Sequence, residues 1–286
     1  MTAKAGLLVA LGVITAAFTL LWGLSLRAEG VRAPTLAELG IGFLTDFLDT
    51  LGIGSFAVTT ALFKLLKTCP DEDIPGSLNV GHAIPTFAEA FIFIALVEVE
   101  GKTLVLMILA SVLGAWLGAG HVAKWSRRKI QIGMGLALLA AAGFFLMKNL
   151  GLFPAGGDSL ALSGWLLVAG LVGNFVFGAL MTLGIGAYAP SMILVSLLGM
   201  NPVAAFPIMM GSCAFLMPAA SVKFVQQRRY AAAPSLGLTL GGTPAVLIAA
   251  YVVKSLNLTT MRWLIIAVVL YTAVMMLRSA RAEAAR

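Results

Sequence analysis

The stretch Thr50-Leu51-Gly52-Ile53-Gly54-Ser55-Phe56-Ala57 returns in altered form as Thr182-Leu183-Gly184-Ile185-Gly186-Ala187-Tyr188-Ala189. The first five residues of the two copies are identical, and a Leu-Leu pair follows each copy in register. Such a match indicates internal duplication. Each copy interrupts a hydrophobic stretch, 40–66 or 173–199, and three further hydrophobic segments follow it. The sequence therefore predicts a repeat unit of one broken segment and three spans.

The composition excludes a water-soluble fold. The 286 residues are 60% hydrophobic and 11% charged, with a mean hydropathy of +1.00, whereas soluble domains carry about 25% charged residues. Apolar runs long enough, or nearly so, to cross about 30 Å of hydrocarbon as helices recur along the chain. They lack the period-two alternation of barrel strands. We expect an all-α polytopic membrane protein, with spans within 5–26, 104–119, 130–147, 160–181 and 263–277.

Charge and cysteine content remove several other classes. The net charge of +7 lies almost wholly in short connections between apolar runs, which is typical of topological anchoring at a bilayer and not of nucleic-acid binding. Cys69 and Cys213 are far apart and belong to no metal-ligand cluster, so we expect no disulfide, metal site or cofactor. The N-terminal apolar run shows no clear cleavage site and is interpreted as an uncleaved first span.

The basic links predict that the two repeats have opposite orientations. In the first repeat, acidic Glu98 and Glu100 mark the link between the first two full spans, and Lys124 to Lys129 make the next link basic. In the second repeat the order is exchanged: Lys223, Arg228 and Arg229 fill the first of these links, whereas Lys254 and Arg262 flank the second. Because basic short loops favour the cytoplasm, equivalent loops face opposite sides, as in an inverted repeat.

The same count of crossings gives a topology and a division of the chain. Residues 1–37 form an extra N-terminal span and link, 38–150 the first repeat and 151–286 the second, all within one transmembrane domain. The N-terminus is expected outside and the C-terminus in the cytoplasm. Each broken segment must start and finish on one side. The arms on either side of Gly52-Ile53-Gly54 are roughly 13 residues each and span about 20 Å, so we favour two re-entrant hairpins over segments that cross twice.

Irregular backbone at membrane depth is tolerated where it lines a cavity or is buried in protein. A half-helix begins beyond each glycine tip, at about Ser55 and Ala187, and its first N–H groups favour an anion. We therefore expect a site for a small anion such as a sulfonate, sulfite or carboxylate. Close packing is the alternative role for such glycines, and we prefer it for Gly114, Gly118, Gly133, Gly135, Gly241 and Gly242. The expected substrate-binding residues at the tips are Thr50, Gly52, Gly54, Ser55, Thr182, Gly184, Gly186, Tyr188 and Ser191.

Ionisable residues within a membrane are costly and are functional candidates by default. Asp46, Asp49, His82 and Glu89 all lie in the first half, and the aligned residues of the second half cannot ionise. Burial disfavours a charged carboxylate, so Asp49 and Glu89 are the expected proton carriers. Asp46 either joins them or lines a wet cytoplasmic vestibule. His82 either belongs to the site, sharing a polar face with Asn79, or is a hydrogen-bonded packing residue.

With glycine-rich tips, short half-helices and a Gly-x-x-x-Gly span that ends in a basic link, residues 38–278 resemble the sulfite exporter TauE/SafE family of bacterial membrane permeases. The resemblance implies a transporter of organic and sulfur-containing anions in the bacterial plasma (inner) membrane, with proton coupling. The family's glycine signature falls on Gly52, Gly54, Gly184 and Gly186. The chain departs from it in having Thr-Leu-Gly-Ile-Gly-Ser where many members have consecutive glycines, and in carrying Asp46 and Asp49.

The main hypothesis is a secondary active transporter and not an enzyme. It binds a small anion and protons at a midplane site, and this site is open to each side of the membrane in turn. An anion channel of the same fold is the first alternative. An intramembrane serine protease with Ser55 as nucleophile and His82 as base is a weaker one, because Ala187 replaces Ser55 in the repeat.

Overall fold

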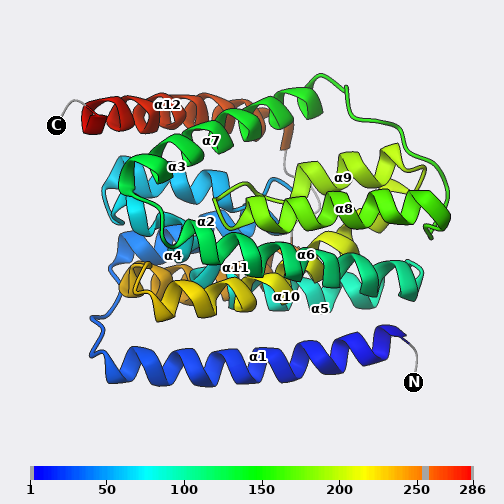
Figure 1. The fold of residues 1–286 in the computed structure, drawn as a ribbon, viewed down its shortest axis with the longest axis horizontal. Helices are drawn as coiled ribbons and strands as arrows, with labels where there is room; N and C mark the ends of the chain where they lie inside the picture. The colour runs from blue at the N-terminus through cyan, green and yellow to red at the C-terminus, as the bar shows by residue number, and fades with distance from the viewer. Residues whose placement is uncertain (1–2, 253–257, 285–286) are drawn as a thin grey trace.

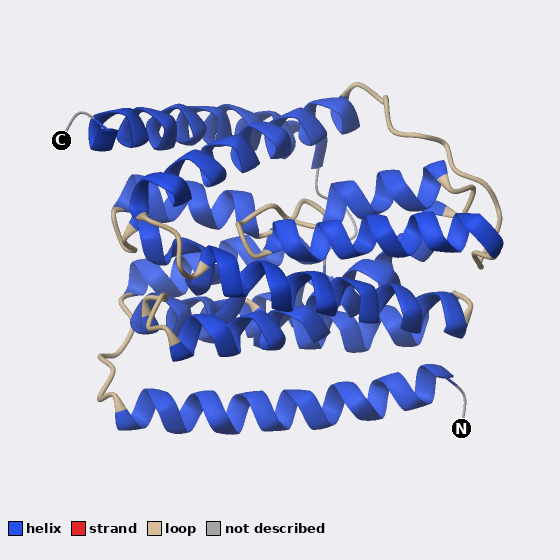
Figure 2. Ribbon diagram, in the orientation of Figure 1, coloured by secondary structure: helices blue, strands red, loops and turns tan. Residues whose placement is uncertain are grey.

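The computed structural model describes residues 3–252 and 258–284, and throughout these ranges the regular structure is helical (Figure 2). Lys254 lies outside the described residues. The elements are α1 (Ala3–Ala28), α2 (Leu36–Thr50), α3 (Phe56–Leu66), η1 (Asp71–Asp73), α4 (Ile74–Gly81), α5 (Ala83–Leu96), α6 (Gly101–Val122), α7 (Arg127–Asn149), α8 (Gly164–Met181), α9 (Tyr188–Leu197), η2 (Pro202–Ala204), α10 (Ala205–Gln226), α11 (Ala232–Val252) and α12 (Leu258–Ala284).

Eight helical segments in the described ranges are long and apolar enough to cross a bilayer, which confirms the all-α polytopic expectation. They comprise α1, α6, α7, α8, α11, α12 and two composite runs, η1–α5 and η2–α10. Large apolar side chains stay exposed on the outer faces of these helices, and Leu21, Leu113 and Trp165 are examples. In water these faces would be an aggregation hazard; in a bilayer lipid tails cover them.

Two helices are interrupted at the duplicated glycine motif. Gly52 and Gly54 have φ of 81° and 94°, and Gly184 has φ of 102°. These values lie in the left-handed region that glycine enters without a Cβ penalty, so the helix stops there and restarts. The arms are 15 and 11 residues in the α2–α3 pair and 18 and 10 residues in the α8–α9 pair. The arms around the first tip are near the expected roughly 13 residues each, and at both tips the arm before the glycines is the longer one.

The arm before each tip packs along a helix of the other half. Helix α2 lies on α11, and α8 lies on α6. A Cβ at Gly241 would collide with the carbonyl oxygen of Leu39, and one at Gly114 with that of Phe175. This close approach of backbones confirms the packing role expected of Gly114, Gly118 and Gly241. Gly133 and Gly135 likewise leave room for leucine side chains.

Links from both halves meet at one end of the bundle. Arg229 donates to the carbonyl oxygen of Trp125 at 3.1 Å and to that of Glu72 at 3.3 Å. Lys64 forms a 2.5 Å ion pair with Asp71, which also accepts from Gln131. The opposite end joins the α5–α6 link to the α7–α8 link, where the Glu100 amide donates to the Leu160 carbonyl. The two basic links therefore share an end, as the loop charges predict.

Helix α1 lies along one edge of the molecule, and α7 and α12 lie along the opposite edge (Figure 1). Helix α1 contacts α5, α6 and α10, and its Lys4 donates to the Val97 carbonyl at 2.6 Å. This peripheral position fits an extra span outside the repeats.

Candidate functional site

Both glycine tips lie inside the bundle, with α2 and α3 toward one side of it and α8 and α9 toward the other (Figure 1). Helices α3 and α9 begin at Phe56 and Tyr188, one residue beyond the expected starts. The tips touch each other: a Cβ added to Gly52 would lie 2.6 Å from the hydroxyl oxygen of Tyr188. Gly54 and Gly186 instead face open space, where an added Cβ would meet nothing within 4 Å.

The open space is a cavity between the tips. Its volume is about 20 Å³, room for one water molecule, and a second cavity of about 30 Å³ adjoins it through Gly54, Gly186 and Tyr188. The bundle is therefore closed around the tips. Both halves contribute to the first cavity, which is lined by Asp49, Gly54, Ser55, Phe56, Thr86, Glu89, Met181, Gly186, Ala187, Tyr188, Met209, Met210 and Cys213.

Two carboxyl groups reach this cavity with different surroundings. Asp49 accepts a hydrogen bond from the Ser55 hydroxyl at 2.6 Å and is partly exposed. Glu89 is 1% exposed; its Oε1 accepts from Thr50 at 2.7 Å, while its Oε2 has no partner among the described residues. A buried carboxylate oxygen without a donor is costly, whereas a protonated carboxyl has an O–H to donate into the cavity. Glu89 is therefore the better placed of the two to hold a proton.

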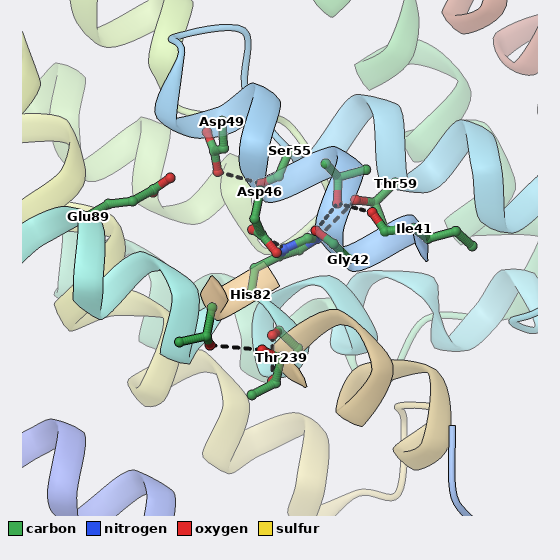
Figure 3. A network of polar contacts seen from close by, with 12 residues as sticks. Ile41, Gly42, Asp46, Asp49, Ser55, Thr59, His82, Glu89 and Thr239 are labelled. Carbon is green, nitrogen blue, oxygen red and sulfur yellow. Dashed lines mark hydrogen bonds and ion pairs between the residues drawn. The ribbon is translucent and has the colours of Figure 1, made fainter. Parts of the chain in front are cut away.

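Asp46 and His82 do not line this cavity and form a buried pair with each other (Figure 3). The Asp46 carboxylate lies 2.7 Å from His82 Nδ1, and His82 Nε2 lies 2.9 Å from the Thr59 hydroxyl. All three residues are 0% exposed. This burial contradicts the alternative that Asp46 lines a wet vestibule, and supports the interpretation of His82 as a hydrogen-bonded packing residue. The Thr59 hydroxyl, the His82 imidazole and the Asp46 carboxylate are linked in a row that resembles a hydrolase triad. The Thr59 hydroxyl, however, has no exposed surface.

Ser55 and His82, the nucleophile and base of the protease alternative, are hydrogen-bonded to other residues and not to each other in the described structure. A nucleophile and its base must lie within hydrogen-bond reach, but Ser55 donates to Asp49, and His82 is engaged by Asp46 and Thr59. The Asp46 carboxylate also packs against the opposite half through Oδ2, which has no hydrogen-bond partner among the described residues. Gly242 of α11 sits against its Oδ2 so closely that any Cβ would collide with it. Gly242 is thus a packing glycine, as expected, but it packs on a carboxylate and not on another helix backbone.

Several expected site residues lie away from the cavity. Asn79 donates to the Pro75 carbonyl at 2.8 Å, and Thr182 to the Ala179 carbonyl at 2.7 Å, so both serve their own helices. Gly184 packs against Met134 and Leu78. Ser191 is buried in α9, and its hydroxyl has no hydrogen-bond partner in the described part of the chain. The cavity thus unites Asp49, Gly54, Ser55, Glu89, Gly186 and Tyr188 of the expected set.

The two half-helix ends are not equivalent donors. In the first turn of α3, Phe56, Ala57 and Val58 each carry an N–H, and Ser55 makes no side-chain cap. Helix α9 begins Tyr188-Ala189-Pro190, and proline has no N–H. The end of α3 therefore offers the richer set of donors.

Comparisons with protein families, curated proteins and solved structures give no match.

One residue at the site escaped the sequence analysis. Lys148, in the last turn of α7, donates to the Tyr188 hydroxyl oxygen at 3.1 Å, and its ammonium lies 4.6 Å from the centre of that ring. A lysine at the end of an apolar span is normally an interfacial anchor, so nothing in the sequence links it to a tip 40 residues away.

Proposed function

We propose that this protein is a secondary active transporter of small organic or sulfur-containing anions, driven by protons. The observation that carries the proposal is the shared cavity: two glycine-broken helices from different halves meet there, with buried Glu89, whose Oε2 has no hydrogen-bond partner among the described residues. Broken helices that meet inside a bundle are the usual site architecture of secondary transporters. The proposal agrees with the resemblance to the TauE/SafE permeases.

The two halves are proposed to be inverted repeats with re-entrant hairpins that enter from opposite faces. The exchange of packing partners supports this arrangement, because α2 pairs with α11 as α8 pairs with α6. The shared end of the two basic links supports a cytoplasmic location for residues 123–126 and 227–231, by the preference of basic loops for the cytoplasm. The N-terminus is then outside, the C-terminus is cytoplasmic, and the bacterial inner membrane is the proposed location.

The anion is proposed to bind where the tips now touch. A sulfonate, sulfite or carboxylate is too large for a cavity of about 20 Å³, so the tips must separate to admit it. N–H groups of α3 and the Ser55 hydroxyl would then face the anion. Movement of one repeat against the other would expose this site to each side in turn, which is alternating access.

Glu89 is proposed to couple the anion to a proton. In its protonated form the Glu89 Oε2–H donates a hydrogen bond into the cavity; in its ionised form it repels an anion there. Binding of the anion therefore requires the proton, and the two move together. Asp49, bonded to Ser55, is assigned to positioning the hairpin end and not to carrying the proton.

Uptake by proteoliposomes tests this function. The purified protein should accumulate at least one of ethanesulfonate, sulfite and acetate when the lumen is made alkaline, and a protonophore should abolish accumulation. Flux that follows only the anion's own gradient would favour the channel alternative. Absence of flux for every anion in both directions would refute the proposal.

A further inference from the structure

We propose that Lys148 of α7 and Tyr188 of α9 bind the charged group of the transported anion, so that both halves recognise the anion while Glu89 carries the proton. The inference rests on the proposed function and adds the residues that supply positive charge to the anion-binding site. It is drawn from the contact between the end of α7 and the second glycine tip.

The Lys148 side chain points into the protein. Its ammonium contacts a tyrosine that is 8% exposed, at 3.1 Å from the hydroxyl oxygen and 4.6 Å from the ring centre. A lysine that only anchored a helix end would extend toward the headgroups. The ammonium is a three-donor group with a full charge, and it lies against Tyr188, which lines both cavities between the tips.

Tyr188 connects the ammonium to both cavities. It is the first residue of α9 and lines the two cavities together with Gly54 and Gly186. The preceding turn of α7 supplies Phe144 and Phe145 to the wall of the second cavity. A phenol oxygen that accepts a hydrogen bond from an ammonium becomes a stronger O–H donor. Lys148 and Tyr188 thus offer an anion two adjacent donors, one of them charged.

The two halves differ at the equivalent position. Phe56 occupies in the first tip the place of Tyr188 in the second, and it has no hydroxyl. Phe56 lies against the His82 ring, whereas Tyr188 lies against the Lys148 ammonium. Both aromatic residues line the cavity that Asp49 and Glu89 also reach. A cavity with an ammonium beside one wall and a glutamate that can hold a proton on another can bind an anion and a proton together.

Four variants test the inference: Lys148→Gln removes the charge, Lys148→Arg keeps it, Tyr188→Phe removes the hydroxyl, and Lys129→Gln is the matched control. Lys129 is an exposed residue in the first turn of the same helix. Two readouts are taken. The first is the rise in melting temperature of the purified protein with increasing ethanesulfonate, sulfite or acetate at constant ionic strength. The second is the Michaelis constant and the pH-driven accumulation ratio for the same anions in proteoliposomes.

Loss of a charged hydrogen bond weakens binding about tenfold or more, so Lys148→Gln should raise the dissociation and Michaelis constants by that factor. Its accumulation ratio should stay that of the wild type, because Glu89 is intact. The affinity of Lys148→Arg should lie between those of the wild type and Lys148→Gln. Tyr188→Phe should weaken binding severalfold, and Lys129→Gln should leave the affinity unchanged. Equal affinities for wild type and Lys148→Gln would overturn the inference and leave the transporter proposal standing. Wild-type protein that is neither stabilised by nor transports any of the anions would overturn both.

Discussion

The substitution Glu89→Gln isolates proton coupling from folding and anion binding. The amide keeps an oxygen to accept from Thr50, as Glu89 Oε1 does at 2.7 Å, and turns an N–H donor toward the cavity, as the protonated acid would. The fold should therefore lose no more than about 1 kcal/mol, the net worth of one hydrogen bond. The variant should bind the anion but should no longer release or take up a proton with it.

The magnitude follows from a single carrier group. If one proton accompanies each monovalent anion, transport is electroneutral, and a gradient of one pH unit, about 1.4 kcal/mol, supports about a tenfold concentration ratio. Two coupled carboxyls would support about a hundredfold ratio. We expect the wild type and Asp49→Asn to reach the tenfold ratio and Glu89→Gln to reach a ratio of one while still exchanging labelled for unlabelled anion.

Ethanesulfonate is the suitable anion for this assay, because a strong acid does not cross the bilayer in a neutral form and so gives no background accumulation. Steady-state ratios are measured at imposed gradients of zero, one and two pH units, with equilibrium exchange run alongside. A Glu89→Gln variant that still accumulates the anion tenfold per pH unit would refute the coupling argument. A wild-type slope of one hundredfold would show that a second proton accompanies each anion.

Two further outcomes are expected. Cysteines placed at Arg128 and Arg228 should both resist an impermeant thiol reagent added outside intact cells, because the two basic links share an end. A cysteine at Ala155 should react, and the native cysteines are buried and give no background. Labelling of the two links on opposite sides would contradict the inverted topology. Gly186→Val should abolish anion binding without unfolding, since its Cβ would face the cavity. The control Gly143→Val, on an open outer face of α7, should leave anion binding unchanged. Normal affinity in Gly186→Val would mean that the tip glycines serve helix packing only.

The duplicated motif made much of the fold accessible from sequence. Two glycines in a mid-span position predict a helix break, and the structure breaks there with left-handed backbone at Gly52, Gly54 and Gly184. The half-helix starts and the packing glycines followed from the same local rules. The unequal arms were missed, although α2 begins at a capping box of Thr35 and Glu38, a local signal that lies before the apolar stretch.

The site was less predictable because its contacts join distant parts of the chain. Asp46 and Asp49 are three residues apart, yet one is paired with His82 and the other reaches the cavity. The approach of Gly242 to Asp46 and that of Lys148 to Tyr188 depend on how helices of the two halves cross. Residue spacing on a single helix carries no information about such crossings, so burial and partners could be assigned only in three dimensions.

Counterflow tests the central claim most directly, namely that this is a carrier with one site that opens to each side in turn. Proteoliposomes are loaded with unlabelled ethanesulfonate, diluted into a trace of labelled ethanesulfonate without a pH gradient, and followed over time. The account predicts a transient accumulation of label above its external concentration, saturable by the external anion and abolished in Gly186→Val. Label that rises to equilibrium without overshoot, at a rate proportional to concentration, would contradict it and would identify a channel.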